Sequence, residues 1–159
     1  HQNIANRLLD KKDSTEVYIR AIRAEFTRIN RLENLRVDTI EANEYSTEGG
    51  EIRCYYEGKK MVKLTVSFYG EMGRSYCEYY LRNGNLIFSY QQKEEYEEPI
   101  GNGKVKAKLT EEQRFYLNNE QLIHYIDNSG NKLTKEQLLE KQKFILEEWS
   151  IMLNEISRT

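Results

Sequence analysis

Four side chains could supply nitrogen or sulfur to a metal ion or a nucleophile: His1, Cys54, Cys77 and His124. Their spacing matches no zinc pattern, because zinc sites usually carry closely spaced pairs of ligands. Cys77 and His124 could form a nucleophilic dyad. Both fall among the apolar positions of their predicted strands, however, where a small buried thiol and a buried imidazole are ordinary core residues. We expect no metal, no cofactor and no catalytic residue from this set.

Two turn segments resemble parts of known binding loops. Gly58-Lys59-Lys60 lacks the earlier glycine and the Ser or Thr of a phosphate-binding loop. The segment 127–131 resembles part of a calcium loop, but its glycine comes too early and no glutamate follows at the required distance, so we expect a plain Asx turn there. The 26 acidic residues offer many carboxylate pairs for glycoside hydrolysis, and nothing in the sequence selects one.

Tyrosine is the other chemical feature, with 12 in 159 residues. The strand registers argued below place five tyrosines and one isoleucine on the sheet face opposite the predicted core: Tyr69, Tyr76, Tyr80, Ile87, Tyr116 and Tyr125. Tyrosine combines rigid apolar area with a hydroxyl group, which suits a protein or a carbohydrate ligand. The alternative is that cross-strand aromatic pairs only stabilise an exposed sheet, by about 0.2–1 kcal/mol each.

Composition restricts the class of protein. The 24 basic and 26 acidic residues nearly balance, which argues against nucleic acid as the main partner. No apolar run reaches the ~18 residues of a transmembrane helix. A chain of this length, 38% hydrophobic, is expected to form a single domain over residues 1–159.

Two segments have the apolar period of an amphipathic helix. Ile19, Ile22, Phe26 and Ile29 share one stripe, which predicts a helix over about 14–32 that begins near Asp13. Thr134 and Gln137 have the spacing of a capping box, which predicts a second helix over about 135–157. Its inward residues should be Leu138, Ile145, Trp149, Met152 and Ile156.

Between the helices the apolar period becomes two and turn signals recur, which predicts strands joined by hairpins over about 36–127. Their expected ranges are 36–46, 51–57, 60–69, 74–82, 85–91, 112–117 and 121–127. The turn at Asn83-Gly84 pairs Leu81 with Leu86, Tyr79 with Phe88 and Cys77 with Tyr90. The turn at 70–73 pairs Phe68 with Ser75, Val66 with Cys77, Leu64 with Tyr79 and Val62 with Leu81. Both registers place one apolar set on the same face.

The predicted fold is therefore α+β: an antiparallel meander of about seven strands with the N-terminal and C-terminal helices packed on one face. In a meander the strands of Cys54 and Cys77 lie about 10 Å apart, too far for a disulfide, so we expect two free thiols. Segment 92–111 should form a protruding hairpin with acidic residues opposite lysines rather than a metal loop. The segment 79–87 is echoed at 115–123, which predicts two similar hairpins or a short repeat.

Three runs carry a resemblance to a family: Ser46 to Glu51, Tyr69 to Gly73 and Glu78 to Phe88. Over about Leu35 to Leu133 the chain resembles uncharacterised exported or lipid-anchored proteins of gut-type Bacteroidetes. The resemblance implies a periplasmic or cell-surface location in a Gram-negative source, is compatible with a lipid anchor on an N-terminal segment outside this sequence, and carries over no functional residue. We expect a non-enzymatic binding module of the envelope that uses the tyrosine face, with a glycan-active or other hydrolase as the alternative.

Overall fold

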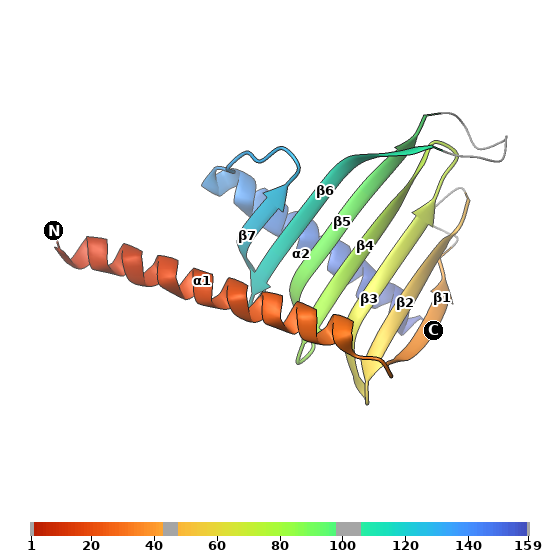
Figure 1. Cartoon of the computed structure of the whole chain (residues 1–159), viewed down its shortest axis with the longest axis horizontal. Helices are drawn as coiled ribbons and strands as arrows, with labels where there is room; N and C mark the ends of the chain where they lie inside the picture. The colour runs from red at the N-terminus through yellow and green to blue at the C-terminus, as the bar shows by residue number, and fades with distance from the viewer. Residues whose placement is uncertain (1, 43–47, 98–105, 159) are drawn as a thin grey trace.

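The protein forms one seven-stranded antiparallel sheet with a long helix on each of its two faces (Figure 1). The computed structural model describes residues 2–42, 48–97 and 106–158. The helices are α1 (Gln2–Arg31) and α2 (Lys135–Ser157). The strands are β1 (Arg36–Glu41), β2 (Gly50–Glu57), β3 (Lys60–Tyr69), β4 (Gly73–Arg82), β5 (Asn85–Tyr96), β6 (Ala107–Asn118) and β7 (Gln121–Asp127). They pair in chain order, so the predicted α+β meander of seven strands is confirmed.

The predicted packing of both helices on one face is wrong. Ile145, Trp149 and Met152 of α2 are buried with Leu64 and Tyr79 on one side of the sheet. A second buried cluster lies on the other side, where α1 packs in front of the strands in Figure 1. It contains Ile22, Ile29, Val62, Tyr80, Phe88 and Tyr116.

Adjacent large residues explain why both faces need a cover. Because neighbouring residues of a strand point to opposite faces, Tyr79 faces α2 and Tyr80 faces α1. Phe115 and Tyr116 divide in the same way. Each pair places one aromatic ring in each layer, and a single layer of helices would leave half of these rings in water.

β-Bulges move further apolar side chains to the α1 side. The register shifts beside Val62, Ile87 and Ile123, each of which lies outside the paired positions close to a two-residue hairpin. All three residues contact or belong to the cluster under α1. The echo between 79–87 and 115–123 is thus a repeated hairpin with a repeated bulge.

The bulges also correct part of the predicted register. Leu81 pairs with Leu86 as expected, but beyond the bulge Tyr79 lies opposite Ser89 and Cys77 opposite Gln91. On the other side of β4 the pairs of Leu64 with Tyr79, Val66 with Cys77 and Phe68 with Ser75 are confirmed. The expected pair of Val62 with Leu81 does not form, because the paired register of β3 and β4 begins at Lys63 and Tyr80.

Of the two helix starts predicted from capping residues, one is confirmed and one is wrong. At α2 the Thr134 hydroxyl accepts from the Gln137 amide at 3.2 Å and the Gln137 side chain accepts from the Thr134 amide at 2.9 Å, so the predicted capping box is confirmed. At α1 the expected start near Asp13 is wrong, since the helix begins at Gln2. Its N-terminal half runs past the sheet edge at β7 (Figure 1).

In the part of the chain that the structure describes, no helix is long and apolar enough to cross a membrane.

The hairpin predicted within 92–111 is present in the residues described. β5 and β6 extend beyond the expected strands, and Glu95 lies opposite Lys108 while Lys93 lies opposite Glu111. The tip of this hairpin, at 98–105, lies outside the described residues. Cys54 and Cys77 are free thiols, as expected from their separation by β3.

Candidate ligand-binding face

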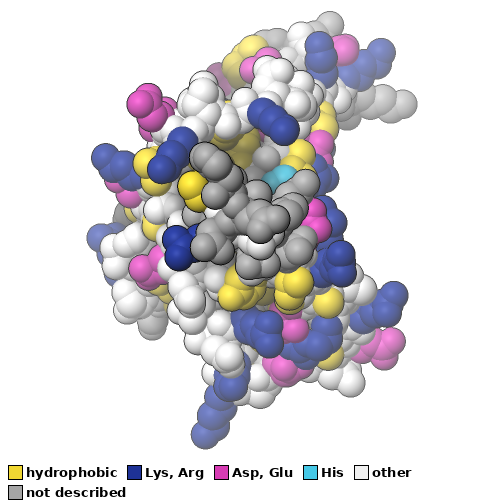
Figure 2. Space-filling view, turned by 90° about the vertical axis from the view of Figure 1, so that its left-hand side faces the viewer, with side chains coloured by type: hydrophobic (Ala, Val, Ile, Leu, Met, Phe, Trp, Pro, Cys, Tyr) yellow, Lys and Arg dark blue, Asp and Glu magenta, His cyan; other side chains and the backbone are white. Residues whose placement is uncertain are grey.

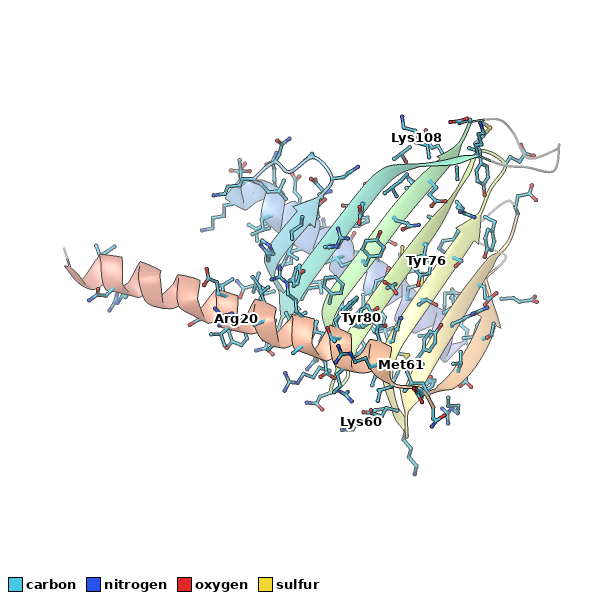
Figure 3. The ribbon with its side chains drawn as sticks, in the orientation of Figure 1. Arg20, Lys60, Met61, Tyr76, Tyr80 and Lys108 are labelled. Atoms are coloured by element: carbon cyan, nitrogen blue, oxygen red, sulfur yellow. The ribbon has the colours of Figure 1, made fainter. Side chains whose placement is uncertain are left out.

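The α1 side of the sheet is only partly covered by α1. The strand registers arrange its side chains in rows that cross the sheet. The row under α1 contains Tyr55, Lys63, Tyr80, Phe88, Tyr116 and His124. Figure 3 shows Tyr80 beside α1 and Tyr76 further along the same strand, clear of the helix. The rows beyond Tyr80 are therefore not covered by α1.

We call the uncovered rows on β2 to β5 the open face. It consists of Glu51, Arg53, Thr65, Ser67, Tyr69, Arg74, Tyr76, Glu78, Tyr90, Gln92 and Glu94. In Figure 2 this side of the molecule forms the right-hand outline, which is hollowed between α1 and the upper ends of the strands. The open face is thus polar and aromatic, and it is concave rather than flat.

A pocket of about 240 Å³ lies between β2, β3 and β4, lined by residues of the open face and by Tyr55 at the end of the adjacent row. We call it the hydroxyl pocket, because five of its lining residues carry a hydroxyl group: Tyr55, Thr65, Ser67, Tyr69 and Tyr76. Glu51 and Arg53 complete the lining and form an ion pair with each other. The pocket therefore presents many neutral donors and acceptors together with one internally balanced pair of charges.

Glu78 fixes the wall of the hydroxyl pocket. Its Oε2 atom accepts hydrogen bonds from the Tyr76 and Tyr80 hydroxyls, each at 3.1 Å, and lies 3.3 Å from the Lys63 ammonium. Lys63 also donates to Asn30 of α1 at 2.9 Å. The network joins the helix to the strand that carries Tyr76, so the ring of this tyrosine is held in place before a ligand arrives.

Burial acts on the two tyrosines of this network. Removal from water raises the pKa of Tyr76 above its usual value, and the neighbouring Glu78 carboxylate adds to the shift. Burial likewise raises the pKa of Tyr80, against the opposing effect of its hydrogen bond with Asn30. Both phenols stay protonated at neutral pH, so they act as hydrogen-bonding groups and not as bases or nucleophiles.

The six residues expected on one face do not lie together. Tyr69 and Tyr76 line the hydroxyl pocket. Tyr80 and Tyr116 are buried under α1, and Ile87 packs against the same cluster. Tyr125 lies on the opposite face, where its ring packs against Phe115 and its hydroxyl donates to Gln113 at 2.7 Å.

Sequence reasoning missed Tyr55 and Tyr90. The bulge near the β4–β5 hairpin reverses the side on which Tyr90 points, since Tyr90 lies opposite Glu78 rather than Cys77. Because Val62 is a bulge residue, Tyr55 lies opposite Lys63 rather than opposite Val62. Tyr55 therefore points to the α1 side of the sheet. The sequence contains a signal of these bulges. Two consecutive apolar residues follow each bulged hairpin, where strict alternation predicts a single one.

The other residues considered for catalysis or metal binding have structural contacts instead. Cys77 packs with the α2 cluster, whereas the ring of His124 packs against Tyr116 on the α1 side, so they form no dyad. Asp127 accepts from the Ser129 amide at 2.9 Å, which is the expected Asx turn. Among the described residues, no group of three or more His, Cys, Asp or Glu side chains could hold a metal ion.

Comparisons of this chain with protein families, with curated proteins and with solved structures find no match.

Proposed function

We propose that this chain is a non-enzymatic binding module and that the hydroxyl pocket on its open face binds a carbohydrate. The observation that carries the proposal is the lining of the pocket, in which five hydroxyl groups and one charged pair surround about 240 Å³. Specific small-molecule sites combine a concave shape with a few fixed polar groups. Here the network around Glu78 supplies that fixation for Tyr76.

The chemistry of the lining favours a sugar over an apolar protein surface. Hydroxyl groups donate and accept, so they can match the hydroxyls of a sugar in several orientations. The rings of Tyr55, Tyr69 and Tyr76 add apolar area for the C–H faces of a sugar ring. An interface with an apolar protein segment would instead leave the hydroxyls of Thr65 and Ser67 without partners, at a cost of about 1–3 kcal/mol each.

We propose binding rather than hydrolysis at this site. Glycoside hydrolysis uses two carboxyl groups about 5–10 Å apart across the scissile bond. Among the residues that line the hydroxyl pocket, Glu51 is the one carboxylate, and it is paired with Arg53. Glu78, on β4 and separated from the strand of Glu51 by β3, is held by Lys63 and two tyrosines.

The place of action is part of the same proposal. The sequence resemblance supports a periplasmic or cell-surface location, where a module that binds carbohydrate would meet glycans of the envelope or of the surroundings. Fractionation of cells that express the native gene, followed by immunoblotting, tests this location. Recovery in the cytoplasmic fraction alone would contradict it.

A glycan array followed by titration calorimetry tests the binding proposal. The intact protein should bind a defined set of glycans, and Tyr69→Ala should weaken the best of them at least tenfold, because Tyr69 lines the pocket. Tyr18→Ala is the matched control, since Tyr18 is 46% exposed on α1 and Tyr69 is 42% exposed. Equal binding by the two variants, or no glycan bound by the intact protein, would overturn the proposal.

A further inference from the structure

A second, smaller crevice lies between α1 and the sheet. Its volume is about 140 Å³, and it is lined by Ile22, Arg23 and Phe26 from α1 and by Phe88, Arg114 and Tyr116 from the strands. None of these residues lines the hydroxyl pocket. The crevice is therefore a separate candidate site, at the part of the sheet that α1 crosses.

The walls of the crevice are apolar and rigid. Ile22, Phe88 and Tyr116 are each at most 6% exposed. The ring of Phe88 makes an edge contact with Phe26 at 5.5 Å between centroids and another with Tyr116 at 4.9 Å. Aromatic rings that pack on one another in this way have little freedom to move apart, so they leave a slot that suits a flat or narrow apolar group.

Two guanidinium groups border this slot, and they differ in their partners. Arg114 forms an ion pair with Glu112 at 2.5 Å and lies 4.9 Å from the centre of the Tyr90 ring. Arg23 lies 5.7 Å from the centre of the Tyr116 ring. Arg23 forms no ion pair with any other side chain in the described part of the chain. Its positive charge is thus not balanced by a neighbouring carboxylate, although it lies next to a buried apolar slot.

The neighbouring histidine responds to the same charge. Burial lowers the pKa of His124, and the positive charge of Arg23 lowers it further. Because the His124 ring packs against Tyr116, it lies behind the wall of the crevice. Of the two arginines that line the crevice, Arg114 is paired with Glu112, so Arg23 carries the positive charge that faces a ligand there.

We propose that the crevice binds a small organic anion, with an apolar body between the aromatic walls and a carboxylate on Arg23. The charge complements Arg23, which can form two parallel hydrogen bonds with a carboxylate. The apolar lining complements the body of the ligand. This site is independent of the carbohydrate site proposed above.

Three probes separate the two parts of this proposal. Benzoate carries both the ring and the charge, benzyl alcohol carries the ring alone, and acetate carries the charge alone. Chemical-shift titration of the ¹⁵N-labelled protein should show saturable binding of benzoate, with the largest shifts at Arg23 and Tyr116. Benzyl alcohol and acetate should each bind at least tenfold more weakly. Equal affinity for benzoate and benzyl alcohol would overturn the role of Arg23.

Matched variants locate the site. Arg23→Gln should weaken benzoate at least tenfold, and Arg23→Lys should retain more of the binding than Arg23→Gln. Arg20→Gln should have no effect, because Arg20 lies one turn earlier on α1 and does not line the crevice (Figure 3). Far-ultraviolet circular dichroism and thermal melts verify that each variant is folded.

The outcomes also distinguish this site from the hydroxyl pocket. Tyr69→Ala should retain benzoate binding, and Arg23→Gln should retain glycan binding. No saturable benzoate binding by the intact protein, or an equal loss in Arg20→Gln and Arg23→Gln, would overturn the proposal without affecting the carbohydrate site.

Discussion

The side-chain amide of Asn30 donates a hydrogen bond of 3.1 Å to the hydroxyl of Tyr80, 50 residues further along the chain. This contact connects the C-terminal part of α1 with the middle of the sheet. It lies at the edge of an apolar layer, where the Tyr80 ring packs against Phe26 at 4.8 Å between centroids. Tyr80 is therefore a core residue with a polar end, and not part of an exposed surface.

The first prediction follows from the burial of Tyr80. Tyr80→Ala should destabilise the protein by about 3–5 kcal/mol, because it removes a fully buried ring. Leu64→Ala, in the other core, should cost about 2–5 kcal/mol. Tyr69→Ala is the exposed control and should cost much less, since Tyr69 is 42% exposed. Urea unfolding of the three variants makes the comparison. A small loss in Tyr80→Ala would show that α1 does not cover this ring in solution.

Much of the fold was predictable because it depends on local signals. Hairpin turns and alternating residues around Leu64 and Val66 predict the strands, and the capping box at Thr134 predicts the start of α2. The side on which α1 packs was not predictable in the same way. It depends on the β-bulges beside Ile87 and Ile123, and a bulge changes the face of every residue beyond it.

The candidate site was predictable only where no bulge intervenes. Tyr69 and Tyr76 lie in the part of β3 and β4 whose register follows from the turn at 70–73, and both line the hydroxyl pocket. Tyr80 and Tyr116 point to the expected face, but this face is covered by α1 at their end of the sheet. Tyr125 lies beyond a bulge and points to the other face.

The second prediction concerns the Glu78 network. Glu78→Gln should destabilise the protein by about 1–3 kcal/mol, because it removes the charge that balances Lys63 and weakens the acceptor of two tyrosine hydroxyls. The side chains of Lys63 and Glu78 are each only 15% exposed, so water compensates little. Chemical unfolding at neutral pH measures the loss.

Glu147→Gln is the matched control for this substitution. Glu147 lies 4.0 Å from Lys143 on α2, and both side chains are largely exposed. Breaking such a surface pair should change the free energy of unfolding by less than about 0.5 kcal/mol. Equal effects of the two substitutions would mean that the Glu78 network does not join α1 to the sheet.

The third prediction concerns Gly73 at the start of β4. A Cβ atom added there would overlap the backbone carbonyl of Glu94 in the neighbouring strand. Gly73→Ala should therefore separate β4 from β5 at this end and cost at least about 3 kcal/mol. Gly130→Ala is the control, because Gly130 has a φ of 71° but open space around its Cα, so only about 1–2 kcal/mol of backbone strain is expected. Thermal melts that rank Gly130→Ala below Gly73→Ala would contradict the close approach of these strands.

The last prediction is a pH dependence that originates at His124. Burial first, and then the charge of Arg23, lower the pKa of His124 below its ordinary value. The unfolded chain, in which histidine has a pKa of about 6.5, therefore binds a proton more readily than the native protein does. Protonation favours unfolding, so stability should fall as the pH decreases from about 6.5 towards the native pKa of His124.

His124→Gln should remove this part of the pH dependence. Urea unfolding between about pH 5 and about pH 7 tests it, because the free energy of unfolding of the native sequence should rise more steeply with pH than that of the variant. His1 is present in both proteins and cancels in the comparison. Equal slopes would show that the His124 ring is hydrated and does not pack behind Tyr116.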